Sequence, residues 1–189
     1  MNSDGMKKIK MIHLVLLLAC ILCNVIGVVE VFGIGFSSMT AAMAVVDVLN
    51  IVAMVFGLLY LRNEYQKSAA PYYKAFMTCM LVVYVFKSIS GIFNFGMDIR
   101  TIGSMLCVVA VFLLAFGKDL GKQLTWILWA VLILDQIEKM IYGLGGIQNS
   151  TYLVNTNTLS IAISNLLTIG TMGLMIHGKY KDKESRGSH

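Results

Sequence analysis

Eight charged side chains lie inside or at the edges of long apolar runs, where they could bind an ion or a polar solute. They are Glu30, Asp47, Lys87, Asp98, Arg100, Asp135, Glu138 and Lys139. A charged side chain at the centre of a membrane-spanning helix costs at least about 2.5 to 3.5 kcal/mol. Several such residues at one depth therefore predict a polar site inside a membrane protein.

The segment 135–139 concentrates ionisable groups within little more than one helical turn. Asp135 and Lys139 are four residues apart, a spacing that favours an ion pair within the helix. Glu138 lies three residues from Asp135, and two carboxylates that close can share a proton. This carboxylate pair is the one candidate for enzymatic chemistry. The sequence contains no nucleophile elbow, phosphate loop, HExxH motif or dinucleotide fingerprint, so we predict that the protein is not an enzyme.

Other polar side chains share helix faces with the buried charges. Asp47 and Asn50 are three residues apart, and Lys87 shares a face with Asn94. The candidate ligand-binding residues are the charged Glu30, Asp47, Lys87, Asp135 and Glu138, with Asn24, Asn50 and Asn94 as hydrogen-bonding neighbours.

The signs of the eight charges do not balance, because five are acidic and three are basic. If every possible ion pair forms, two acids remain for a cation, a proton or an amine-bearing ligand. In the alternative reading, the lysines only neutralise buried acids, the pairs are structural, and the remaining acids are protonated.

Redox and metal chemistry are weakly supported. Cys20 and Cys23 have a CxxC spacing, but they lie in the middle of a predicted helix instead of at the N-terminus that would activate a thiol. A cysteine in that position behaves as a small hydrophobe. His13 and His177 lie at the predicted inner ends of helices, without a metal-ligand spacing. We therefore predict no cofactor and no metal.

The elements that position these residues follow from the composition. The chain has 189 residues, of which 58% are hydrophobic and 13% charged. A soluble domain of this length could not bury so much apolar surface. The continuous apolar runs favour helices over the alternating segments of a β-barrel. The net charge of +5 does not indicate nucleic-acid binding, because the basic residues lie in short loops and tails.

We predict an all-α integral membrane protein, an up-down bundle of six transmembrane helices. The predicted spans are 11–34, 40–61, 74–95, 101–117, 123–144 and 154–177. They form a single domain over 11–178, between an N-terminal tail at 1–10 and a C-terminal tail at 179–189 that ends like the start of a histidine tag. Lysine and arginine are concentrated in alternate connections and in both tails, which predicts that both termini are cytoplasmic. A rise of about 1.5 Å per residue then places the candidate residues in the outer half of the bilayer.

Our first hypothesis is a small-solute transporter, or a substrate-binding transport component, with an outward-facing acidic site. The architecture resembles the substrate-binding membrane components of energy-coupling-factor vitamin transporters. That resemblance implies energising subunits, but it rests on helix count, length and the depth of the polar residues, and no family residues are carried over.

A homodimer, the lipid bilayer and a small ligand are the other expected partners, in a bacterial cytoplasmic membrane. The alternative is a sensor, immunity protein or accessory subunit with structural ion pairs.

Overall fold

The computed structural model describes residues 3–34, 38–63, 69–97, 99–117, 120–147 and 153–186. The described chain is helical, which confirms the all-α prediction. The six helices are α1 (Ser3–Ile34), α2 (Ser38–Asn63), α3 (Ala69–Phe95), α4 (Ile99–Phe116), α5 (Lys122–Ile147) and α6 (Leu153–Arg186). Each contains one of the predicted apolar runs. α1 and α6 continue as helix into residues that the sequence suggested to be tails.

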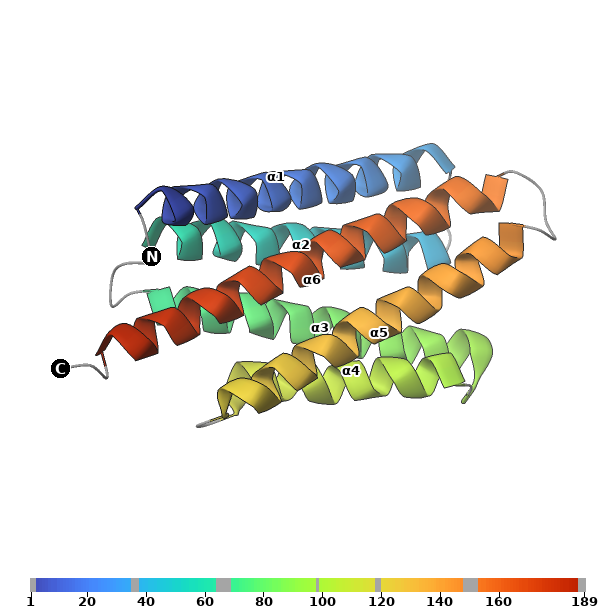
Figure 1. Cartoon of the computed structure of the whole chain (residues 1–189). Coiled ribbons are helices and arrows are strands. Elements are labelled where there is room, and N and C mark those ends of the chain that lie inside the picture. Colours follow the sequence, from blue (N-terminus) through green and yellow to red (C-terminus); the bar gives the residue numbers. More distant parts are fainter. Residues whose placement is uncertain are drawn as a thin grey trace.

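The helices pack in the order in which they occur in the chain. Each helix contacts the next, and α6 returns to α1, so that the bundle closes. α6 also contacts α2 and α3. In Figure 1, α6 slants across the other helices, and the two chain ends lie at the same end of the bundle. α6 is therefore the element on which side chains from most other helices can meet.

α3 is followed by a glycine in a left-handed conformation. Gly96 has φ of 71°, a left-handed conformation that a side chain disfavours. Its N–H donates to the Ile92 carbonyl at 2.9 Å, and the Thr101 hydroxyl donates to the Gly96 carbonyl at 2.9 Å. These bonds satisfy backbone groups at the end of α3 and set the start of α4 beside it.

α5 and α6 are held together by a tryptophan that lies against a glycine. Trp129 on α5 donates its indole N–H to the Ile169 carbonyl of α6 at 2.9 Å. A methyl group added to Gly173 would lie only 2.8 Å from the Trp129 ring. The glycine therefore permits the close approach of the two helices.

We expect Gly173→Ala to lower the free energy of unfolding by about 1 to 3 kcal/mol, because the added methyl group must displace a packed ring. Gly121→Ala is the matched control, since a methyl group there would meet nothing within 4 Å. Thermal unfolding of both variants in the same detergent measures the difference. Equal stability of the two variants would show that α5 and α6 do not pack through this contact.

The outer surface of the bundle is apolar. Exposed side chains include Leu22 on α1 (61%), Leu106 on α4 (57%) and Ile127 on α5 (60%). Soluble monomers rarely expose large apolar patches, so this surface fits contact with lipid. The interior, in contrast, contains amide, hydroxyl and carboxyl side chains.

The prediction of six spanning helices is corrected in part. In the part of the chain that the structure describes, three helical segments are long and apolar enough to cross a membrane: 7–29, 44–63 and 70–93. The apolar stretch of α4, from Thr101 to Phe116, is shorter. α5 carries Asp135 and Glu138, and α6 carries a stripe of Ser, Thr and Asn residues. The two carboxyl groups lower the hydropathy of α5, whereas the stretch 159–176 of α6 has no charged residue and begins among side chains outside the described part.

Candidate functional site

A hydrogen-bonded network centred on Asn24 joins α1, α2 and α6. The Asn50 amide donates to Asn24 Oδ1 at 3.0 Å, and the Asn24 amide donates to Ser164 Oγ at 3.1 Å. The Cys20 thiol and the Thr168 hydroxyl are 3.0 Å apart. Asn24 is 1% exposed and Asn50 is 3% exposed. Buried amides are stable only when bonded, so this network fixes the three helices relative to one another.

Asp47 lies one turn from Asn50 on α2, against the backbone of α1. A methyl group added to Gly27 would lie 2.6 Å from Asp47 Oδ2. Gly27 lies three residues from Asn24 on α1, and the Asp47 carboxylate occupies the space that this glycine leaves. Asp47 therefore extends the Asn24 network by one turn.

A second cluster contains a half-buried lysine. Lys87 on α3 donates its ammonium group to Asn165 Oδ1 on α6 at 2.8 Å. The same ammonium lies 5.8 Å from the centre of the Tyr84 ring. The Tyr84 hydroxyl in turn interacts electrostatically with Cys107 on α4 and with Asp135 on α5. Lys87 and Tyr84 of α3 together therefore interact with side chains from α4, α5 and α6.

The acidic part of this cluster comes from α5. The Gln136 amide donates to Asp135 Oδ2 at 2.8 Å, and both residues are buried. A methyl group added to Gly103 on α4 would lie 3.3 Å from Asp135 Oδ1, so the carboxyl group also packs against α4. Glu138 is half-buried, and its Oε1 atom is enclosed. Asp135 therefore faces the bundle interior.

The two clusters meet on α6, because Ser164 bonds to the first and Asn165 to the second. We call the combined set the polar layer. Its members are Asn24, Asp47, Asn50, Lys87, Asp135, Gln136, Glu138, Ser164 and Asn165.

The polar layer lies nearer to one end of the bundle. Eight residues separate Lys87 from the end of α3 at Phe95, and twelve separate Asn165 from the start of α6 at Leu153. At about 1.5 Å per residue, these separations correspond to depths of about 12 and 18 Å. Both are measured from the end opposite the chain termini (Figure 1).

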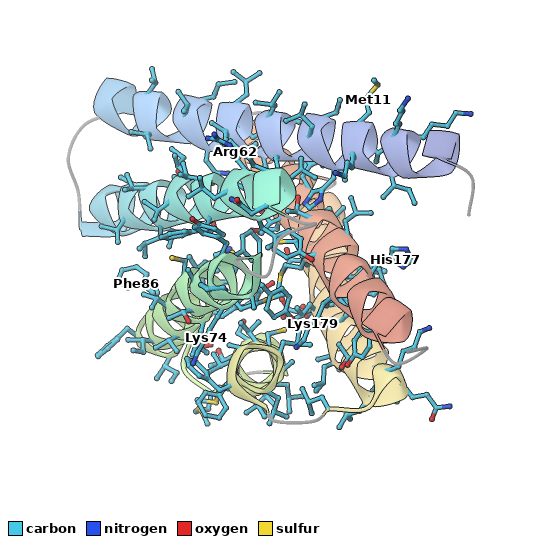
Figure 2. All side chains as sticks on the ribbon, turned by 90° about the vertical axis from the view of Figure 1, so that its left-hand side faces the viewer. Met11, Arg62, Lys74, Phe86, His177 and Lys179 are labelled. Carbon is cyan, nitrogen blue, oxygen red and sulfur yellow. The ribbon has the colours of Figure 1, made fainter. Side chains whose placement is uncertain are left out.

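The opposite end of the bundle is basic and closed by tyrosines. Figure 2 looks onto this end, where Arg62, Lys74 and Lys179 lie. Lys179 Nζ lies 4.8 Å from the Tyr73 ring centre, and the rings of Tyr73 and Tyr60 are 6.4 Å apart. The buried hydroxyl groups of both tyrosines donate to backbone carbonyls of neighbouring helices. These contacts join α2, α3, α4 and α6, so the basic end is filled by side chains.

Not all of the predicted site residues can be placed. The structure brings Asn24 and Asn50 into contact and puts Lys87 and Asp135 around Tyr84. The side chains of Glu30, Asn94, Arg100 and Lys139, and residue Asp98, lie outside the described part of the chain.

Sequence reasoning missed two amides of the polar layer, Gln136 and Asn165. Neither is charged, so neither stood out in an apolar run. The available signals were the position of Gln136 between Asp135 and Glu138, and that of Asn165 beside Ser164 on the polar stripe of α6.

The donor set does not suit a metal centre. Within the described segments, no group of three His, Cys, Asp or Glu side chains could hold a metal ion. The four cysteines are free, and Cys20 bonds to hydroxyl and carbonyl oxygens. The layer can instead donate and accept hydrogen bonds and carry charge inside an apolar shell.

The fold and the polar layer define an all-helical protein with apolar helices suited to a membrane. Comparison with known proteins adds no relative, since no protein family, no curated protein and no solved structure matches the chain.

Proposed function

We propose that this is a multi-pass membrane protein that binds a small polar solute in the polar layer and serves in its transport. The observation that carries the proposal is the presence of two polar clusters, one with Asp47 and one with Lys87 and Asp135, inside a bundle with an apolar exterior. Charged groups within a membrane protein most often mark a solute or ion pathway.

In this proposal all six helices cross the bilayer. α4 supports a spanning role, because its exposed side chains form an apolar stripe with spacings of three and four residues: Ile102, Leu106, Val109, Phe112 and Phe116. α5 also exposes apolar side chains, among them Ile127 and Leu134. α6 has few exposed side chains in its described part and is lined by polar groups, so its neighbours shield it from lipid.

The basic end faces the cytoplasm in this proposal, in agreement with the bias of lysine and arginine toward cytoplasmic loops. The tyrosine contacts of Tyr60 and Tyr73 fill that end. Solute would then enter from the outer side, where the polar layer is less deep. Transport would require either movement of α6 or an energising partner subunit.

The alternative function is a sensor, immunity protein or accessory subunit whose polar layer is purely structural. The Asn24 network favours this alternative, because its bonds connect three helices without any ligand. The two functions predict different results when the charge of Lys87 in the second cluster is removed. Transport predicts a loss of bound solute, whereas the structural alternative predicts only a loss of stability.

The test is mass spectrometry of small molecules extracted from the purified protein. We expect a polar solute to co-purify with the unmodified protein in near-stoichiometric amount, and to be depleted at least tenfold from Lys87→Met and Asp47→Asn proteins. Lys74→Met is the control, because Lys74 lies at the basic end over the Phe116 ring. If no solute is enriched, and both layer variants only lower the melting temperature, the structural alternative is correct.

A further inference from the structure

The basic end of the bundle carries a large excess of positive charge. Four segments of the sequence start, end or connect the helices there: 1–10, 62–74, 118–122 and 179–189. Together they contain twelve lysine and arginine residues and five aspartate and glutamate residues. Seven positive charges therefore remain even when every acid at this end is paired. A surface with such an excess attracts anions.

Lys74 is a basic side chain of this end that lies directly over the apolar exterior. It is exposed on α3, and its Nζ atom lies 5.1 Å from the centre of the Phe116 ring. Phe116 is the last residue of α4 and is itself exposed. A lysine near the end of an apolar helix extends its stem along apolar surface and keeps its charge at the membrane–water boundary. The Phe116 ring thus holds the ammonium group where the apolar surface of α4 ends.

Two apolar stripes lead from this point toward the middle of the bundle. The stripe on α3 lies on the same helix face as Lys74 and consists of exposed side chains three and four residues apart: Val82, Val85 and Ile89. The stripe on α4 leads away from Phe116 through Phe112 and Val109, and the two phenylalanine rings are 5.4 Å apart. Because α3 and α4 pack against each other and Lys74 reaches Phe116, the two stripes adjoin at the basic end.

The dimensions of this surface are those of one membrane leaflet. Val85 lies eleven residues from Lys74, a separation of about 16 Å along the helix. Half of the hydrocarbon core of a bilayer is about 15 Å thick. The ammonium group and the apolar stripes are therefore spaced like the phosphate and the acyl chains of a phospholipid.

The charge of the basic end selects among phospholipids. A zwitterionic headgroup carries a cation beside its phosphate, and seven excess positive charges disfavour that cation. A headgroup with net negative charge has no such penalty, and each nearby lysine or arginine strengthens its binding.

We propose that α3 and α4 bind an anionic phospholipid at the basic end of the bundle. The Lys74 ammonium group contacts the lipid phosphate, and the acyl chains lie along the two exposed apolar stripes. This lipid site lies on the exterior of the bundle, so it is separate from the polar layer and independent of solute binding there.

Thermal unfolding of the full chain in detergent, titrated with lipid, tests the proposal. The probes are phosphatidylglycerol and phosphatidylcholine with identical acyl chains. Phosphatidylglycerol is expected to raise the melting temperature in a saturable way and to bind at least about fivefold more tightly than phosphatidylcholine. Lys74→Met keeps an apolar stem but removes the charge, and it should weaken the binding of phosphatidylglycerol about fivefold. Lys74→Arg keeps the charge and should retain binding.

Lys8→Met is the matched control, because it removes one exposed positive charge from the same end. Lys8 lies on α1, which contacts neither α3 nor α4 in the described structure, and Figure 2 shows α1 and α4 on opposite sides of the bundle. Charge interactions fall off over about 8 Å at physiological salt, so this variant should change binding less than about twofold. Glycerol 3-phosphate tests the headgroup without acyl chains and should not raise the melting temperature.

Three results would overturn the proposal. Equal binding of phosphatidylcholine would remove the role of charge, and equal weakening by Lys8→Met and Lys74→Met would replace a defined site by diffuse attraction. Equal stabilisation by glycerol 3-phosphate would assign Lys74 to a soluble phosphate instead of a lipid. Solute bound in the polar layer should be the same in Lys74→Met and unmodified protein, so failure of the lipid site leaves the proposed function untouched.

Discussion

Replacing Asn24 by leucine is expected to lower the free energy of unfolding by about 2 to 3 kcal/mol. Asn24 is the centre of the network that joins α1, α2 and α6. Its removal breaks the bonds to Asn50 and Ser164 and leaves the Asn50 amide buried without an acceptor. Interhelical bonds in membranes contribute about 0.6 to 1.7 kcal/mol each, and an unsatisfied buried group costs about 1 to 3 kcal/mol.

Asn63→Leu is the matched control for this prediction. Asn63 is the same residue type at the end of α2, and its amide donates to the Leu59 carbonyl of its own helix. Its replacement should change stability by less than about 0.5 kcal/mol. Unfolding followed by circular dichroism during titration with a denaturing detergent compares the two. If both leucine variants are equally stable, Asn24 does not join the helices.

The second large effect is expected at Lys87. Lys87→Met removes the one described cation of the polar layer and its bond to Asn165. We expect a loss of stability of about 1.5 to 3 kcal/mol, the range for a hydrogen bond to a charged group.

A double-mutant cycle isolates the bond itself. Lys87→Met, Asn165→Leu and the double variant should give a coupling energy of about 1 to 2 kcal/mol, because the two groups bond directly across α3 and α6. The cycle of Lys74→Met with Asn165→Leu is the control. Lys74 lies at the basic end, and this pair should be additive within about 0.5 kcal/mol. Additivity in the Lys87 cycle would contradict the contact.

The helices were predictable because their signal is local. Each apolar run of about 20 residues coincides with an observed helix, and the single proline, Pro71, lies near the start of α3. The number of membrane spans was less well predicted. α5 buries Asp135 and Gln136 inside the bundle, so helical packing compensates for the lower hydropathy of this helix.

The polar side chains that share a helix face with a charged residue could be predicted from the sequence. Asn24 and Asn50 were expected to neighbour the charged residues, and the structure places them in contact with each other. The partners across helices were not predictable, because they depend on the rotation and register of α6. For that reason Asn165, the acceptor of the Lys87 ammonium, was not among the candidates. Sequence periodicity defines a helix face, but not the residue opposite it.

The most direct test of a solute-binding polar layer is an electron cryomicroscopy structure of the protein in lipid nanodiscs, at a resolution that shows bound small molecules. The account predicts density for a non-protein molecule between α3, α5 and α6, within hydrogen-bonding distance of Gln136 or Lys87. A layer in which protein side chains fill this space and pair every carboxylate, with no such density, would contradict it.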